Sequence, residues 1–410
     1  MAAVDWRVED FDSADPGFQA NPYPTYARMR EQAPVHHRKN ESGYEMSYCF
    51  RYDDVLELLR SADNHTVSIA DEVIAGILDQ PGSPLYSLAR IISSVMLTQD
   101  GDDHRRLRGL VGQAFTPRRV AALRPRIGSI IDDLLAKITP RGEMDLLTDF
   151  AAPLPIIVIA ELLGLPPEDR VQLREWSDRM ATFIDGTIRE AGIPAAAVAA
   201  DQMCAYMEGI IEQRRREPRD DLISALALAH EEADQLSDDE LLGTIGLILA
   251  AGHETTTNLI GNGMLALLRH PDQLAALRRD PLCIETAVEE LLRFDSPVQT
   301  TSRVPTHEIE VRGVRIPAGR EVGLYLGSAN HDPEVFSDPA VLDITRDEGR
   351  HLSFGYGAHF CLGASLARLE GQLAILALVE RLPGLRLAEQ DLAWRSGIVL
   401  RGLTRLPLCF

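Results

Sequence analysis

The sequence predicts a mainly helical protein with small β-sheets, an α+β fold built as one large domain over residues 1–410. Segments with the 3.6-residue spacing of helices are long, whereas segments with strand character are short. Pro and Gly occur mostly singly between them, and no repeat, low-complexity tract or Gly/Ser linker marks a domain boundary. With 45% hydrophobic and 25% charged residues, the chain has the composition of a globular protein with a large core.

Hydrophobic spacing gives the individual elements. The helical segments are Ile127 to Ile138, Ala197 to Gln213, Leu241 to Leu268 and Leu362 to Arg381. The predicted strands are Tyr44 to Phe50, Ile309 to Ile316 and Glu321 to Tyr325.

The best-marked helix is predicted to begin at Ser237 and to end at His270. Ser237 and Glu240 form the S-x-x-E pattern of a capping box, and Pro271 stops the helix. Roughly thirty residues at about 1.5 Å each give a length of about 45 Å. Residues 246–252 are apolar on all sides and are therefore expected in the core. The polar cluster 253–257 follows, and its burial is costly unless it is hydrogen-bonded or functional.

Charge and cysteine content exclude several classes of protein. The formal net charge of -21 argues against a general nucleic-acid binder, which needs a basic surface. Residues 1–24 contain no apolar run long enough for a signal peptide or a membrane span, so we expect a cytoplasmic protein without a membrane segment. Five scattered cysteines without a C-x-x-C pair favour a reducing compartment over a disulfide framework or a zinc ribbon.

Two partial motifs inside the long helix are misleading. His253 and Glu254 begin the zinc-protease pattern H-E-x-x-H, but Thr257 stands where the second histidine is needed. Residues 261–266 fit G-x-G-x-x-A, yet they lie within a helix and not at a strand-to-helix turn. We therefore expect neither zinc nor a dinucleotide there.

Residues 354–363 carry the strongest motif, F-G-x-G-x-H-x-C-x-G. Glycines allow unusual backbone dihedrals and close approach to a flat partner, and a cysteine before a helix has its thiolate stabilised by the helix dipole. An isolated cysteine is more often simply buried, which we accept for Cys49, Cys204, Cys283 and Cys409. Cys361 is different, because the motif resembles the haem-binding loop of the cytochrome P-450 family, of the soluble bacterial type.

The resemblance covers almost the whole chain through motifs in the order of that family. Besides the cysteine loop they are Asn21 to Pro24, His104 to Arg108, Ala114 to Arg118, Ala251 to Thr256 (A-G-x-[DE]-T-[TS]), Glu290 to Arg293 (E-x-x-R) and Asn330 to Pro333. In the last motif His331 replaces an arginine, a departure expected to affect only a peripheral contact.

The resemblance implies a single domain with haem b (iron protoporphyrin IX) between the long central helix and the cysteine loop. Cys361 is expected to bind the iron, with Phe354, Gly355 and Gly363 beside the haem. The expected propionate partners are His104, Arg108, Arg303 and His359, although Arg303 alone reads equally as a surface arginine.

The same resemblance assigns the remaining motif residues. Gly252 is expected to leave room for oxygen. Thr255 is expected to loosen the helix locally, and Glu254 is expected to relay protons. His253 is interpreted as lying on the helix surface or behind these residues. Glu290 and Arg293 share a helix face, and the family resemblance gives them a role in folding.

The implied function is that of a monooxygenase, which inserts one atom of dioxygen into a mid-sized hydrophobic molecule with electrons from a separate ferredoxin and reductase. The basic stretch from Arg105 to Arg119 is a candidate docking surface for the ferredoxin, although a solvated helix face explains some of these arginines equally well. The alternatives are a peroxide-driven enzyme and a non-catalytic haem protein that binds a ligand or gas. The first is disfavoured by the pair Glu254 and Thr255.

Substrate specificity is expected from mostly apolar side chains, each of which also suits ordinary core packing. The expected pocket residues are Leu247, Ala251, Val298, Gln299, Ile398 and Val399, with the loop from Val67 to Val95. Gln299 and Thr301 are the polar candidates for orienting the substrate. The segment from Phe183 to Met203 is interpreted as a mobile lid or as an ordinary helix pair.

Overall fold

The longest helix, α13 (Asp238–Arg269), has the start and the end predicted for it. The Ser237 amide donates to Glu240 Oε2 at 2.7 Å, and the Glu240 amide donates to Ser237 Oγ at 3.2 Å, so both halves of the capping box form. Pro271 begins the next helix instead of extending this one. The expected burial of residues 246–252 is met only in part, because Leu249 is 0% exposed, whereas Leu247 and Gly252 are partly exposed and Ala251 is exposed.

The computed structural model describes residues 8–39, 45–61, 64–65, 71–184, 193–228 and 236–410. The chain divides into two units: unit 1 is 1–67, 262–361 and 390–404, and unit 2 is 68–261, 362–389 and 405–410. The division falls inside α13, so this helix contributes to both units. No helix among the described residues combines the length and apolar character that a bilayer crossing requires.

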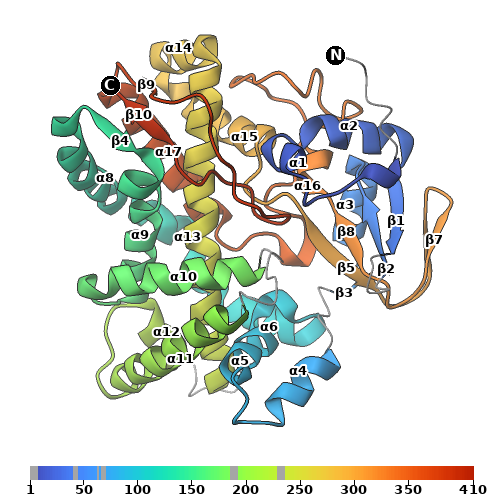
Figure 1. Cartoon of the computed structure of the whole chain (residues 1–410). Helices are drawn as coiled ribbons and strands as arrows, with labels where there is room; N and C mark the ends of the chain where they lie inside the picture. Colours follow the sequence, from blue (N-terminus) through green and yellow to red (C-terminus); the bar gives the residue numbers. More distant parts are fainter. Residues whose placement is uncertain (1–7, 40–44, 62–63, 66–70, 185–192, 229–235) are drawn as a thin grey trace. The chain divides into compact units, whose positions relative to one another are not determined.

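Unit 1 is built around a five-stranded sheet in the order β1-β2-β8-β5-β3 (Figure 1). β2 pairs with β8 in parallel, and the other neighbours are antiparallel. The strands are β1 (Val35–Lys39), β2 (Glu45–Cys49), β3 (Asn64–His65), β5 (Thr301–Pro305) and β8 (Val322–Leu324), with the hairpin β6 (Ile309–Val311) and β7 (Val314–Ile316). The helices are η1 (Val8–Asp10), α1 (Pro16–Ala20), α2 (Tyr23–Gln32), α3 (Tyr52–Arg60), α14 (Pro271–Arg279), η8 (Pro281–Cys283), α15 (Ile284–Phe294), α16 (Leu326–Ala329) and η9 (Gly357–His359).

Unit 2 is mostly helical, and its core joins side chains of α5, α6 and α9 to α13. Its α-helices are α4 (Asp71–Leu78), α5 (Tyr86–Ser94), α6 (Gly101–Gly112), α7 (Pro117–Ala122), α8 (Arg124–Ile138), α9 (Pro153–Leu163), α10 (Arg170–Ile184), α11 (Ile193–Arg216), α12 (Leu222–Leu228) and α17 (Ala364–Arg381). The short helical turns are η2 (Met96–Thr98), η3 (Gln113–Phe115), η4 (Thr139–Arg141), η5 (Leu147–Ala151) and η6 (Pro167–Asp169). A three-stranded sheet joins β4 (Glu143–Asp145), β10 (Pro407–Cys409) and β9 (Arg386–Leu387) in that order.

The predicted fold class is confirmed, because long helices dominate and the sheets are small. Each predicted helix matches an observed one, and the three predicted strand segments contain β2, the β6–β7 hairpin and β8. Within the expected lid, residues 185–192 lie outside the described residues, and the flanking segments belong to α10 and α11. In the loop expected from 67 to 95, residues 67–70 also lie outside them.

Candidate active site

The cysteine loop is a tight turn held by its own backbone. The Cys361 amide donates to the Phe354 carbonyl at 2.9 Å. Gly355 and Gly357 have φ values of 66° and 75°, a conformation that side chains disfavour. A Cβ at Gly357 would lie 2.6 Å from the Leu59 carbonyl oxygen, so the glycine also allows a close approach. Cys361 is only partly buried.

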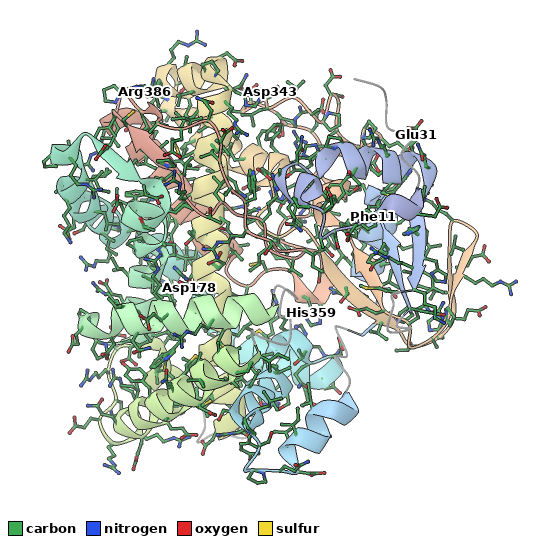
Figure 2. All side chains as sticks on the ribbon, in the orientation of Figure 1. Phe11, Glu31, Asp178, Asp343, His359 and Arg386 are labelled. Atoms are coloured by element: carbon green, nitrogen blue, oxygen red, sulfur yellow. The ribbon has the colours of Figure 1, made fainter. Side chains whose placement is uncertain are left out.

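Two basic residues of unit 1 were predicted to bind an anionic cofactor. Arg303 lies on β5, is 6% exposed, and donates from Nη1 to the Ser302 carbonyl at 2.7 Å. A buried guanidinium needs an anion or several acceptors to offset its desolvation, so the interpretation of Arg303 as a surface residue is wrong. His359 lies in η9 of the cysteine loop, is half-buried, and is labelled in Figure 2.

In unit 2, His104 and Arg108 lie one turn apart on α6. His104 is 3% exposed, and both burial and the neighbouring Arg108 hold the pKa of its imidazole below the usual value. The ring is therefore neutral near pH 7 and suits a hydrogen bond to an anion, whereas Arg108 supplies the positive charge.

α13 has one face that the protein covers incompletely. Leu247, Gly252 and Thr255 are partly exposed and Ala251 is exposed, whereas the residues around them are buried. The spacing of four, five and eight residues from Leu247 puts all four on one side of the helix. An uncovered stripe in a buried helix is a surface against which a flat cofactor or an apolar ligand can lie.

Thr255 and Gly252 each modify α13 locally. Thr255 Oγ donates to the Ala251 carbonyl at 2.7 Å, one turn back along the helix. A Cβ at Gly252 would lie 2.6 Å from Ile159 Cδ1, so the glycine allows α13 to pack against the end of the Ile159 side chain of α9 without displacing it.

Glu254 and His253 point into the interior of unit 2. Each is 1% exposed, so the interpretation of His253 as a helix-surface residue is wrong. The Asn258 amide donates to Glu254 Oε1 at 3.4 Å. His253 Nδ1 lies 3.2 Å from Ser177 Oγ and 3.7 Å from Asp178 Oδ1 on α10. Figure 1 shows α10 crossing α13, and Figure 2 labels Asp178.

Ser177 and Asp178 were missed in the sequence. Nothing in the local pattern of α10 marks them, because their importance arises only where the two helices cross.

The E-x-x-R residues form a buried ion pair in unit 1. Arg293 donates from Nε and Nη2 to the two Glu290 oxygens, each at 2.7 Å, and the side chains are 2% and 1% exposed. Glu290 Oε1 also accepts from the Asp343 amide, and Arg293 donates to the Asn330 and Pro339 carbonyls. These bonds tie α15 to the chain that leads into the cysteine loop.

His331 belongs to the same core and is not peripheral, which corrects the expectation from the sequence. It is 4% exposed, stacks on Tyr23 with ring centroids 4.2 Å apart, and lies 2.9 Å through Nε2 from the Phe294 carbonyl. Burial lowers the pKa of His331 to about 3, so the ring is neutral.

Of the expected pocket residues in unit 1, Gln299 has a different role. Its amide donates to the Ser296 carbonyl at 2.8 Å, and its oxygen accepts from Tyr26 at 2.9 Å. Since the side chain is 4% exposed and engaged at both ends, it does not orient a substrate. Val298, Val399 and Ile398 remain partly exposed or exposed.

The expected basic stretch is smaller than the sequence suggests. Arg105 pairs with Asp102, and Arg106 pairs with Asp103 and with Glu240 of α13. Arg118 and Arg119 on α7 are both exposed. The candidate docking charges are therefore Arg118 and Arg119.

These residues fit a haem by their chemistry. Unit 1 offers the partly buried Cys361, a glycine loop and the buried cation Arg303, and unit 2 offers His104, Arg108 and the uncovered stripe of α13. A thiolate, basic partners for two carboxylates and an apolar face are the donor set that a haem-thiolate site requires.

Comparison with known proteins leads to the same assignment. The family model for Cytochrome P450 matches residues 168–281 and 282–383. Cytochrome P450 107B1 of Saccharopolyspora erythraea is 44% identical, with 98% of each chain covered. Cytochrome P450 monooxygenase PikC of Streptomyces venezuelae is 41% identical, covering 98% of this chain and 94% of that protein. The solved structure of P450BioI with hexadec-9Z-enoic acid ligated acyl carrier protein has a TM-score of 0.89 and 40% identity. The match covers 96% of this chain and 99% of that chain.

Proposed function

Because the chain belongs to the cytochrome P450 family, we propose that it inserts one oxygen atom into a mid-sized hydrophobic small molecule, by hydroxylation or epoxidation. The chain is a cytochrome P450 monooxygenase with the haem-thiolate cofactor of its family, so a non-catalytic haem protein is not retained as an alternative. The proposal takes residues 1–410 as a single haem-binding domain and the cofactor as haem b.

The observation that carries this proposal is the geometry of the cysteine loop. A partly buried cysteine in a turn fixed by the Phe354 carbonyl would suit a thiolate ligand, so we assign to Cys361 the role of holding the haem iron, with Phe354, Gly355 and Gly363 beside the haem. When bound, the haem supplies the oxygen chemistry. The expected propionate partners are Arg303, His359 and Arg108 as donors with His104 as a neutral hydrogen-bond partner.

Glu254 and Thr255 are the proposed proton-handling residues. The Thr255 hydroxyl shares the Ala251 carbonyl with the backbone, and Glu254, the preceding residue, is a buried acid. A buried acid beside a hydroxyl on the uncovered side of α13 holds a proton close to the place where oxygen reacts. Gly252 keeps that segment packed against Ile159.

The substrate class follows from the apolar lining. Leu247, Ala251, Val298, Val399 and Ile398 are the proposed lining residues, and none of them has a charged side chain. A terpenoid, steroid, macrolide or fatty acid suits such a lining. P450BioI was solved with a fatty acid ligated to acyl carrier protein, so carrier-bound acyl chains belong in any substrate screen.

Electrons are proposed to come from a separate ferredoxin and its reductase. Arg118 and Arg119 are exposed cations that can attract an acidic partner over about one Debye length.

An optical titration tests the proposal. The purified ferric protein is titrated with the four ligand classes, and a saturable Soret shift to high spin identifies the substrate class for turnover assays. Reduction under carbon monoxide reports the axial ligand, and the C361S variant is expected to lose the thiolate spectrum. A thiolate spectrum that survives in C361S contradicts the assignment of Cys361.

A further inference from the structure

Three ionisable side chains of unit 2 meet where α10 crosses α13. One ligand atom each of Asp178, His253 and Glu254 lies within 4.8 Å of the other two. Their exposure differs sharply: the Asp178 side chain is 41% exposed, whereas His253 and Glu254 are each 1% exposed. A carboxylate in contact with solvent therefore lies close to a buried one.

His253 is held in this group by several hydrogen bonds. Ser177 Oγ lies 3.3 Å from the Leu249 carbonyl and 3.2 Å from His253 Nδ1. If the Ser177 hydroxyl donates to the carbonyl, it accepts from a hydrogen on Nδ1, and the Asp178 carboxylate lies 3.7 Å from the same nitrogen. We therefore assign the ring hydrogen to Nδ1. Thr257 also donates to the His253 carbonyl at 2.9 Å.

We propose that Asp178 is the solvent-side carboxylate that supplies protons to Glu254, and that His253 is the residue that positions Asp178 for this. The inference rests on the proposed proton-handling role of Glu254. A distance of up to 4.8 Å between carboxylate oxygens is the span of one bridging water with hydrogen bonds of about 2.7 Å. A proton taken from solvent by Asp178 passes through that water to the Glu254 carboxylate, and Asp178 is restored as the carboxylate.

A purely structural role explains the arrangement poorly. Arg174 Nε also lies 3.7 Å from Asp178 Oδ2 on the same helix, and it is partly exposed. Exposed ion pairs of this kind contribute about 0–1 kcal/mol, so the fold has little need of Asp178. The D178A variant should therefore fold and bind haem normally.

The first experiment measures how much NADH is lost as hydrogen peroxide during turnover with a substrate from the titration. D178A is expected to raise the peroxide-to-product ratio by about ten-fold, below the 10²–10⁴-fold that a positioned general acid contributes directly. Millimolar formate or acetate should restore coupling, because the site is open to solvent. E175Q, which changes an exposed acid of the same helix, is the matched control and should behave as wild type.

A second readout needs no turnover. In the diamagnetic ferrous carbon monoxide form, the ¹⁵N resonances of the His253 ring report which nitrogen carries the hydrogen, and the signal is assigned by its loss in H253Q. Protonation at Nδ1 is expected, with a shift of that resonance in D178A. A ring protonated only at Nε2 overturns the positioning role.

The variants separate this inference from the proposed function. If E254Q uncouples turnover and D178A does not, the supply route through Asp178 is wrong and the role of Glu254 stands. If E254Q itself remains coupled, the proposed proton-handling role of Glu254 fails, and the inference fails with it. Uncoupling in D178A that small acids do not rescue also overturns proton supply by Asp178.

Discussion

Thr255 Oγ donates a hydrogen bond of 2.7 Å to the carbonyl oxygen of Ala251, on the side of α13 that protein atoms leave uncovered. That carbonyl is therefore shared between a hydroxyl and the helix backbone, which loosens the helix at this turn. The preceding residue, Glu254, is buried, so an acid and a hydroxyl lie at the border between the core and the uncovered stripe. This arrangement makes Thr255 the first residue to test.

T255A is expected to consume NADH normally but to release most reducing equivalents as hydrogen peroxide. The variant lacks the hydroxyl that holds a proton near the reacting oxygen, so coupling to product should fall by about ten-fold or more. The measurement is the ratio of product to NADH, with peroxide quantified in parallel. T255S keeps the hydroxyl and serves as the control, and a fully coupled T255A would remove Thr255 from the proton route.

E290Q is expected to destabilise the protein severely. Glu290 accepts two hydrogen bonds from Arg293 and a further one from Arg346, and removing its charge takes the anion away from the buried Arg293 guanidinium. Breaking a buried pair in this way costs about 3–5 kcal/mol.

Unfolding in urea, followed by tryptophan fluorescence, measures that loss. The control is E289Q. The Glu289 side chain is 40% exposed and pairs with His351, so the loss of this ion pair should cost under about 1 kcal/mol. Equal stability of the two variants would show that the E-x-x-R pair does not anchor the core.

G357A is expected to lower stability and haem content together. Gly357 has a φ of 75°, and the Cβ of an alanine there would lie 2.6 Å from the Leu59 carbonyl oxygen. Backbone strain and a steric clash therefore both destabilise the variant. G319A is the matched control, because Gly319 has a φ of 76° but nothing within 4 Å of its Cβ. The difference in thermal midpoint between the variants isolates the clash, and identical midpoints would deny that Gly357 is needed for close approach.

Local signals predicted the elements well. The capping box at Ser237 and the stop at Pro271 predicted the bounds of α13, and short strand-like runs predicted β2 and β8. The glycine pattern around Cys361 likewise predicted a turn, because positive φ values are a local property of the chain.

Roles that depend on distant partners were not predictable. Gln299 looked available for a substrate, but Tyr26, 273 residues away, occupies its oxygen. Arg106 looked like a docking charge, but Glu240, 134 residues away, pairs with it. His253 looked superficial until α10 covered it. In each case the side chain's chemistry was readable, whereas its neighbour was set by helix packing.

R118Q/R119Q is expected to slow the first electron transfer from ferredoxin by about ten-fold at low ionic strength, with no change in substrate affinity. The two arginines are exposed on α7, so their charge acts on the encounter rate and is screened by salt. Stopped-flow reduction as a function of salt measures the effect. R278Q/R279Q removes two exposed charges from α14 as a control, and equal rates in both double variants would move the docking surface elsewhere.

Glu370 makes stability depend on pH. It is 1% exposed on α17, and burial raises the pKa of its carboxyl to about 8, whereas the unfolded chain restores a pKa of about 4.3. Between these values the folded state keeps a proton that the unfolded state has lost. The contribution of the protonated Glu370 carboxyl to the free energy of unfolding is therefore fully present below the unfolded pKa. It is lost as the pH rises through the folded pKa, at up to about 1.4 kcal/mol per pH unit.

E370Q, which is neutral at every pH, should remove this dependence and become more stable than wild type near pH 8. Urea unfolding from pH 5 to pH 9 measures both variants, with E380Q as an exposed control on the same helix. The free energy of unfolding of wild type should fall relative to E370Q as the pH rises and should level off above about pH 8. Parallel curves for wild type and E370Q would mean that Glu370 is ionised in the folded protein, and its burial would then require a cationic partner.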